Sequence, residues 1–203
     1  MVTFNDGANN MPVKGCIVKL EPYQEGSDDP SPTNIRPISG WSGLTVNVAG
    51  KNLLNNTATT QTSNGITWTV NNDGTLTANG TATADSQLRI VVEADSIPTD
   101  TNLYYSGCPS GGDILSKYNC YFWDLTSNRR ATKWDGTSLV ETDHGDTANN
   151  ELRLVSGHRY GFICRVLNGY TVSNIVFKPM IRLASASDST YAHYDGATYP
   201  ISW

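Results

Sequence analysis

Charged residues are scarce in this chain. Asp, Glu, Lys and Arg make up 16% of its 203 residues, against about 25% in an average soluble domain. The net charge of −5 leaves no surplus of Lys and Arg to neutralise phosphates, which argues against nucleic-acid binding. No apolar run reaches the roughly 18 residues of a membrane-spanning helix, so we expect no membrane insertion. The N-terminus has neither the basic start nor the apolar stretch of a signal peptide.

Cysteine is also rare, and its spacing matches no known metal or redox motif. The four cysteines stand at positions 16, 108, 120 and 164, so no Cys-x-x-Cys occurs. Cys164 belongs to an alternating apolar row, which is typical of a small core residue. Without an export signal we predict free thiols. Cys108 and Cys120 are the only pair close enough in sequence to suggest a local disulfide.

The residues that replace charge are small and polar. The chain has 23 Thr, 19 Asn and 18 Ser, together with 18 Gly and 9 Pro. These residue types favour strands and turns, and several compete with a helical backbone for hydrogen bonds. The 5 Trp, 10 Tyr and 4 Phe can fill a core, which argues against disorder. The composition therefore predicts an all-β protein.

Short strands with turn signals between them are expected from about Trp41 onward. Ile66, Trp68 and Val70 alternate with threonines and are followed by Asn72-Asp73-Gly74, a strong hairpin turn. Trp68 and Tyr160 are expected in the core. Further strands are expected at residues 75–81, 88–93, 103–106, 118–125, 138–141, 151–155, 159–167, 171–177 and 180–184. About ten strands at this spacing predict an all-β, jelly-roll-like two-sheet β-sandwich with an extended N-terminal arm.

Three segments are predicted. Residues 1–43 form an N-terminal docking arm, with one strand at 13–20 followed by a Pro-rich extended stretch that cannot build its own core. Residues 44–186 form the sandwich, and residues 187–203 form a C-terminal docking segment. Because the arm needs a surface to pack on, we expect a homo-oligomer.

Several blocks follow one another in an order that resembles a known family. The most specific are Glu21-Pro22-Tyr23-Gln24-Glu25-Gly26-Ser27 and Asn34-Ile35-Arg36-Pro37-Ile38-Ser39-Gly40-Trp41. Residues 4–8, 12–14 and 29–32 complete the arm, and residues 50–54, 73–75, 79–82, 106–112, 177–184 and 191–201 continue the series. The chain resembles tail and minor structural proteins from phages and prophages of gut Firmicutes, whose arm leads into a sandwich similar to a carbohydrate-binding module.

The resemblance implies a protein of the virion, assembled in the bacterial cytoplasm, whose partners are other virion proteins and whose sandwich would hold a host cell-surface glycan or another virion protein. The arm would carry assembly. Its candidate residues are Phe4, Val13, Pro22, Tyr23, Pro30, Pro32, Arg36, Pro37, Ile38 and Trp41.

Two aromatic stretches are candidates for glycan binding, because sugars stack on aromatic faces and hydrogen-bond to polar side chains. If Tyr118, Cys120 and Phe122 face the core, then Tyr121 and Trp123 face outward; the reversed parity, with Trp123 in the core, is equally compatible with the sequence. The second stretch combines Arg130, Trp134 and Asp135 in a turn-rich segment. Trp134 could equally be a loop anchor folded onto the sheet.

Catalytic and metal-binding signals are weak. Glu141, Asp143 and Asp146 form an acidic cluster that could hold calcium, although a solvated loop explains it as well. The Gly-rich segment 106–112 lacks a nucleophile motif and a nearby base, and no carboxylate pair stands out for glycoside hydrolysis. We expect no cofactor and no enzymatic activity.

The sequence thus predicts a non-enzymatic virion structural protein, a tail or particle accessory component, whose sandwich binds host glycan or a partner virion protein. One alternative is a purely architectural capsid or tail decoration protein without a ligand. The other is a polysaccharide-degrading tail component.

Overall fold

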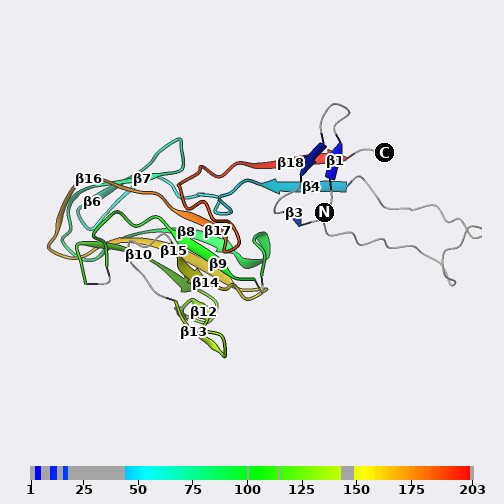
Figure 1. Ribbon diagram of the computed structural model, residues 1–203. Coiled ribbons are helices and arrows are strands. Elements are labelled where there is room, and N and C mark those ends of the chain that lie inside the picture. Colours follow the sequence, from blue (N-terminus) through cyan, green and yellow to red (C-terminus); the bar gives the residue numbers. More distant parts are fainter. Residues whose placement is uncertain are drawn as a thin grey trace, which may run out of the picture. The chain divides into compact units, whose positions relative to one another are not determined.

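The computed structural model describes residues 3–5, 10–12, 16–17, 44–99, 101–113, 115–142 and 149–201. Strands dominate these residues, and the only helical element among them is the 3-10 helix η1 (Ala94–Ser96) (Figure 1). The all-β prediction is confirmed. The chain divides into two compact units, residues 1–49 with 196–203 and residues 50–195.

The larger unit is built around a four-stranded antiparallel sheet in the order β11-β10-β15-β8. Its strands are β8 (Ser86–Glu93), β10 (Tyr118–Asp124), β11 (Arg129–Arg130) and β15 (Arg159–Val166). One face of this sheet is apolar and buried, with Ile90, Phe122, Tyr160 and Phe162 each at most 1% exposed. Because side chains alternate along a strand, the residues between them point to the opposite face.

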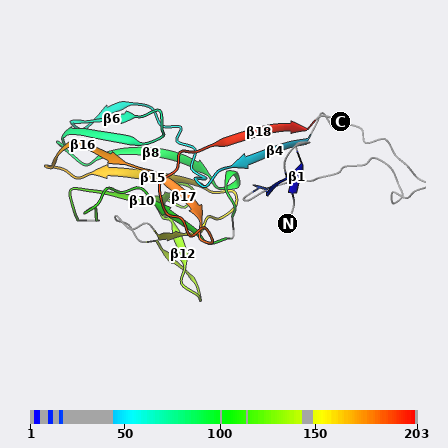
Figure 2. The same cartoon turned by 45° about the horizontal axis from the view of Figure 1, so that its top comes forward.

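Two further sheets pack on this apolar face. One has the order β16-β7-β6-β5, with β5 (Gln61–Ser63), β6 (Ile66–Val70), β7 (Leu76–Thr81) and β16 (Thr171–Phe177). The other has the order β14-β9-β17, with β9 (Leu103–Ser106), β14 (Asn150–Leu152) and β17 (Met180–Leu183). In both cartoon views β6 and β10 lie in different layers (Figures 1 and 2).

Aromatic contacts join these layers. The Tyr105 ring of β9 meets the Phe122 ring of β10 edge-on, with centroids 5.1 Å apart. Tyr118 of β10 meets Phe177 of β16 at 6.1 Å. Trp68 of β6 is fully buried, as predicted, and its indole N–H donates to Ser86 Oγ of β8 at 2.9 Å. The packed layers form an all-β sandwich.

Three cysteines have side chains that the structure describes, and all three are free thiols: Cys108, Cys120 and Cys164. Cys120 and Cys164 are directly opposite each other on β10 and β15, with their sulfur atoms 3.6 Å apart. Both are buried, as the sequence predicts for Cys164. Burial, with hydrogen bonds from Cys108 and Cys164, raises the pKa of the Cys120 thiol.

Most strands expected in the sandwich are present, and those at 103–106 and 171–177 have the predicted bounds. The strand expected at 151–155 is Asn150–Leu152, and of the strand expected at 13–20 the structure describes Cys16–Ile17 alone. The turn-rich stretch after residue 128 is different, because it contains β11 and then β12 (Thr132–Trp134), which pairs with β13 (Leu139–Glu141). β11 is two residues long and β12 is three. Strands this short show no alternating pattern in the sequence.

The described residues of the smaller unit form two sheets. β1 (Thr3–Asn5) pairs with β2 (Asn10–Pro12), and β18 (Gly196–Ile201), β4 (Leu44–Ala49) and β3 (Cys16–Ile17) follow in the order β18-β4-β3. The predicted sandwich limits of 44 and 186 differ from these units, because the strand at 44–49 pairs with the one at 196–201 instead of joining the sandwich. Phe4 lies in β1. The nine other arm candidates, Val13, Pro22, Tyr23, Pro30, Pro32, Arg36, Pro37, Ile38 and Trp41, lie outside the described residues.

Candidate functional site

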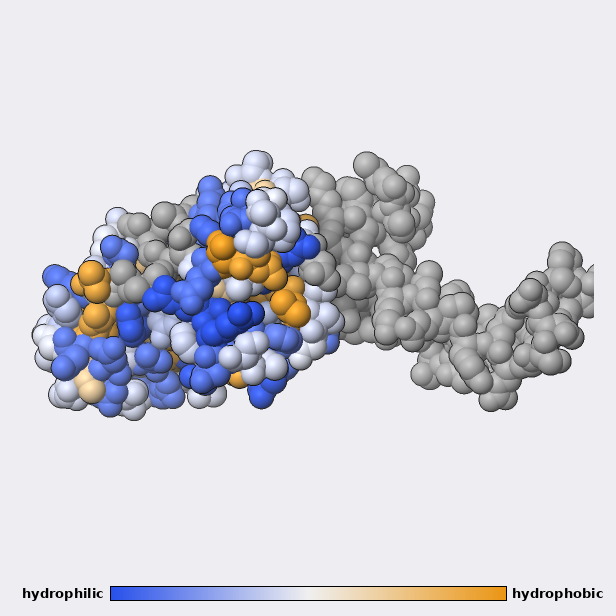
Figure 3. All heavy atoms as spheres, turned by 90° about the horizontal axis from the view of Figure 1, so that it is seen from below, coloured by the Kyte–Doolittle hydropathy of each residue, from blue (hydrophilic) through white to orange (hydrophobic). Residues whose placement is uncertain are grey.

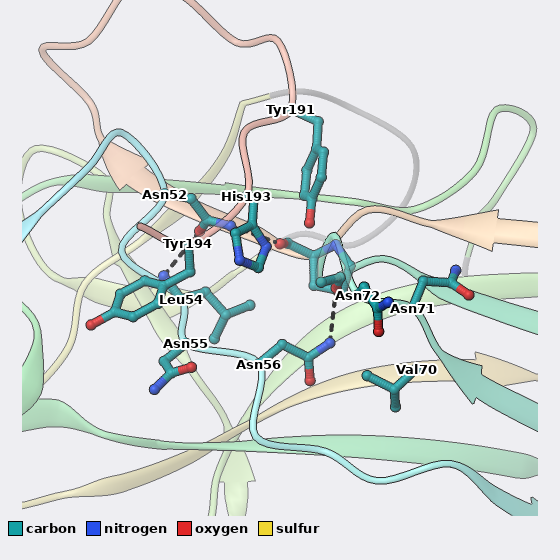
Figure 4. Close-up of a pocket in the computed structure, with 12 residues that line it drawn as sticks. Asn52, Leu54, Asn55, Asn56, Val70, Asn71, Asn72, Tyr191, His193 and Tyr194 are labelled. Carbon is teal, nitrogen blue, oxygen red and sulfur yellow. Dashed lines mark hydrogen bonds between the residues drawn. The ribbon is translucent and has the colours of Figure 1, made fainter. Parts of the chain in front are cut away.

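A cavity of about 150 Å³ opens in the larger unit between three segments that are far apart in sequence. They are residues 52–56, the β6–β7 turn at 70–74 and residues 191–194, with Pro179 beside them (Figure 4). The lining side chains are mostly amide and aromatic: Asn52, Leu54, Asn55, Asn56, Val70, Asn71, Asn72, Tyr191, His193 and Tyr194. Among these described lining residues there is no Asp, Glu, Lys or Arg.

Asn52 links the chain segments at the base of this cavity by hydrogen bonds. Its side-chain oxygen accepts hydrogen bonds from the amides of Leu54 at 2.9 Å and Ile181 at 3.2 Å. Its NH₂ group donates to the carbonyls of Pro179 at 3.2 Å and Ala192 at 3.0 Å. Asn52 is 1% exposed, and these four bonds use its full hydrogen-bonding capacity. It therefore positions the wall segments and has nothing left to offer a ligand.

The β6–β7 turn forms a second wall. Asn71 N–H donates to Thr75 O and Gly74 N–H donates to Asn71 O, both at 2.9 Å, which confirms the predicted hairpin turn. Gly74 has a φ of +79°. Across the cavity, Asn56 donates from its NH₂ group to the Gly74 carbonyl at 2.9 Å.

The third wall comes from residues 191–194. The Tyr191 hydroxyl donates to the Asp73 carbonyl at 2.7 Å and so fastens this segment to the turn. Burial, together with the negative charge of Asp73, raises the pKa of Tyr191 to about 12. The hydroxyl is therefore a permanent donor at neutral pH.

Four lining side chains remain available to a ligand. Asn55, Asn72, His193 and Tyr194 make no hydrogen bond to any other described residue, and each is exposed or half-buried. In Figure 4, Asn55 and Tyr194 lie on one side of Leu54, Asn72 lies on the other, and the His193 ring lies between Tyr194 and Asn72. Their donors and acceptors surround a small apolar surface.

The predicted glycan-binding residues lie elsewhere. Tyr121 and Trp123 are half-buried and lie on the outward side of β10, and Cys120 and Phe122 face the core. This is the first of the two parities that the sequence allowed. Arg130 of β11 is the cross-strand partner of Trp123, so the structure brings these three residues together.

Trp134 and Asp135 belong to the separate β12–β13 hairpin. Trp134 is 40% exposed, and the Arg153 guanidinium lies 5.5 Å from its ring centre. Asp135 accepts hydrogen bonds from the amides of Thr137 and Ser138, both at 2.8 Å, and thereby shapes the hairpin loop.

The acidic cluster proposed for calcium is only partly described. Glu141 is exposed and lies 3.6 Å from the Arg130 guanidinium, and Asp143 and Asp146 lie outside the described residues. Within the described part of the chain, no group of three or more His, Cys, Asp or Glu side chains is arranged to hold a metal ion.

One His–Asp pair is present, between His158 Nδ1 and Asp124 Oδ2 at 2.9 Å. The other Asp124 oxygen accepts the amides of Thr126 and Ser127 at 2.9 and 3.0 Å. Although burial acts to raise the pKa of Asp124, the bonds from Ser127 and His158 lower it below its usual value. Asp124 thus organises the turn that follows β10.

The cavity residues were not predicted as a site. Asn55-Asn56 and Asn71-Asn72 are visible in the sequence as amide pairs, but asparagine pairs also suit ordinary turns. Residues 191–194 were assigned to a docking segment. Only the tertiary fold brings the three segments to one place.

Comparison of the chain with protein-family models, with curated proteins and with solved structures gave no match. In the part of the chain that the structure describes, no helix is long and apolar enough to cross a membrane.

Proposed function

We propose that this protein is a non-enzymatic structural component of a phage or prophage virion whose sandwich binds a neutral sugar unit of a host-surface glycan. The observation that carries the binding proposal is the cavity lined by asparagine, tyrosine and histidine, whose described lining contains no Asp, Glu, Lys or Arg. The virion proposal is supported by the resemblance of the sequence blocks described above.

The chemistry of the cavity supports a sugar ligand. A sugar hydroxyl both donates and accepts, and the free amides of Asn55 and Asn72 supply both functions. Val70 and the Tyr194 ring, both half-buried, offer apolar surface for the C–H groups of the ring. Desolvating a neutral hydroxyl costs far less than desolvating a charge, so an uncharged lining favours a neutral ligand.

The size of the cavity limits how much of a glycan it can hold. A volume of about 150 Å³ is smaller than typical sites for larger ligands. A single sugar unit, at the end of a chain or as a branch, is the ligand that fits. Hydrolysis would use two carboxylates, and the described lining contributes neither.

The surface of the larger unit is compatible with display on a particle. Seen from below, this unit is mostly hydrophilic, with apolar residues in separate small groups (Figure 3). Large continuous apolar patches mark protein interfaces, and this face carries small ones.

A printed glycan array, followed by titration of the neutral glycan with the strongest signal, tests the binding proposal. We expect binding by the natural protein and a loss of about five- to tenfold in Tyr194→Ala and Asn55→Ala, since each removes a contact worth on the order of 1–1.5 kcal/mol. Asn79→Ala is the matched control, because Asn79 is an exposed amide on β7 outside the cavity.

The alternatives predict different results. An architectural protein would bind no glycan on the array. A polysaccharide-degrading component would release reducing ends from the bound glycan. Equal binding by Tyr194→Ala and the natural protein would mean that the sugar does not occupy this cavity.

A further inference from the structure

The outward face of the central sheet carries arginine and aromatic side chains in adjacent rows. In one row Arg89, Ile163 and Tyr121 are neighbours across β8, β15 and β10. In the next row the neighbours are Val91, Gly161, Trp123 and Arg130, across β8, β15, β10 and β11. None of these residues lines the cavity described above.

The absence of a side chain at Gly161 shapes this face. A Cβ atom at Gly161 would lie 3.1 Å from both Cγ and Cδ of Arg89, tighter than ordinary contact. The Arg89 side chain therefore crosses from β8 over β15, toward the strand that carries Trp123. Ile163, also on the outward face, is only 2% exposed, because its neighbours cover it.

Arg89 is the available cation of this surface. Arg165 lies 3.5 Å from Asp85, and Arg130 lies 3.6 Å from Glu141. Arg89 is exposed, and within the described residues no carboxylate pairs with it. The local excess of arginine contrasts with the net charge of −5 for the whole chain.

The aromatic neighbours lie within reach of these cations. The Arg165 guanidinium is 5.4 Å from the Tyr121 ring centre. Burial raises the pKa of Tyr121, and the positive charges of Arg165 and Arg89 oppose that rise. Trp123 is held by a long hydrogen bond from its indole N–H to Asn128 Oδ1 at 3.4 Å. A guanidinium with no carboxylate partner among the described residues thus lies near two half-buried rings.

We propose that this face is a second binding site, for a polysaccharide whose sugars carry a carboxylate. The planar Arg89 guanidinium pairs with the carboxylate, and the sugar ring stacks on Trp123 and Tyr121. The aromatic rings favour a cyclic sugar acid over an open-chain polyanion, because an open chain has no ring face to stack.

Binding of de-esterified polygalacturonate to the full-length protein, measured by calorimetry, tests this proposal. We expect the fully methyl-esterified polymer to bind at least tenfold more weakly, because esterification removes the carboxylate charge. Arg89→Ala and Trp123→Ala should each lose about tenfold or more, and Arg89→Lys should fall between Arg89→Ala and the natural protein. Circular dichroism and Tm identify any variant that fails to fold.

Two matched controls distinguish binding at this site from non-specific attraction of the polymer to positive charge or to aromatic rings. Arg129→Ala removes the same charge as Arg89→Ala. Arg129 is exposed and points to the opposite face of β11 from Arg130. Trp134→Ala removes an aromatic ring from the β12–β13 hairpin. Both should bind like the natural protein.

Several outcomes would overturn the proposal. These are the absence of polygalacturonate binding, equal binding of the methyl ester, an equal loss in Arg129→Ala and Arg89→Ala, and equally tight binding of inorganic polyphosphate. Tyr194→Ala in the cavity should leave polygalacturonate binding unchanged, so this site and the neutral-sugar cavity can fail independently.

Discussion

Single asparagine residues have two separate roles around the cavity. Asn52 is buried and uses all its donors and acceptors to join residues 52–54, β17 and residue 192. Asn55 and Asn72 are exposed and have no partner among the described residues. An amide that is already satisfied gives the site its geometry, and an amide that is not satisfied can exchange water for a ligand.

Tyr191 makes the stability of the cavity wall depend on alkaline pH. Its pKa in the folded protein is about 12, against an ordinary value of 10.0. A raised folded-state pKa contributes stability that is fully present below pH 10 and is lost as pH rises toward 12. We expect a loss of about 1 kcal/mol in this window, less than the full pKa difference would give because the ring is half-buried and solvent screens it.

Urea unfolding at pH 9 to 12 measures this effect. Tyr191→Phe removes the ionisable group, so its free energy of unfolding should fall less between pH 10 and 12 than that of the natural protein. Tyr121 and Tyr160 also have raised pKa values and are retained in both proteins, so they cancel in the comparison. Parallel curves for the two proteins would contradict the assignment.

At the scale of elements, the shape of the cavity depends on the backbone conformation of the β6–β7 turn. Gly74 has a φ of +79°, and a Cβ atom there would lie 2.9 Å from His193 Nδ1 and 3.0 Å from the Tyr191 hydroxyl. The turn therefore depends on glycine both for its conformation and for the close approach of residues 191–193.

Gly74→Ala should destabilise the protein by more than the strain of a positive φ alone, by about 2 kcal/mol, and should weaken neutral-sugar binding. Gly169→Ala is the matched control, because Gly169 has a φ of +82° and a Cβ atom there would meet nothing within 4 Å. It should cost only about 1 kcal/mol and leave sugar binding intact. Chemical denaturation and the glycan titration measure both effects; equal losses in the two variants would exclude the steric part of this explanation.

Some elements were predictable because their signal is local. β6 alternates buried and exposed residues, and β9 and β16 were predicted with their observed bounds. The irregularity in β16 was not predictable: Asn174 has a φ of +50°, and the pairing with β7 shifts between Val172 and Ile175. The extra residue shifts the alternation, because buried Val172 is followed by two exposed residues before half-buried Ile175.

The cavity was not predictable for a different reason. Asn55 and Tyr194 meet only because β17 pairs with β9 and the 52–54 segment hydrogen-bonds to β17. The residues paired between β17 and β9 are 74 to 80 positions apart, and Leu53 and Ile181 are 128 apart. Nothing in the local sequence around Tyr194 distinguishes a cavity wall from a docking segment.

At the scale of the whole molecule, residues 50–195 contain a complete core. The two ends of this unit are joined by a hydrogen bond from Gly50 N–H to the Asp195 carbonyl at 3.1 Å. Its buried aromatic residues come from β6, β9, β10, β15 and β16, all inside this range. The unit therefore has the properties of an independently folding domain.

A fragment of residues 50–195 should unfold cooperatively and bind neutral sugar like the full chain. The environment of Trp68, followed by fluorescence, and urea unfolding measure its folding. Under the proposed virion function, the full chain should be incorporated into particles and the fragment, which lacks the N-terminal arm, should not. A fragment that does not fold would show that the larger unit depends on residues beyond its own core.

β18 has a consequence for how copies of this protein can associate. Pro200 lies in this strand at the edge of the order β18-β4-β3, opposite Thr45. Proline has no amide hydrogen and is tolerated in sheets mainly at edges. Proline in an edge strand is one of the ways in which natural sheets discourage pairing with a further strand, so we expect this edge to be a poor template for fibre growth.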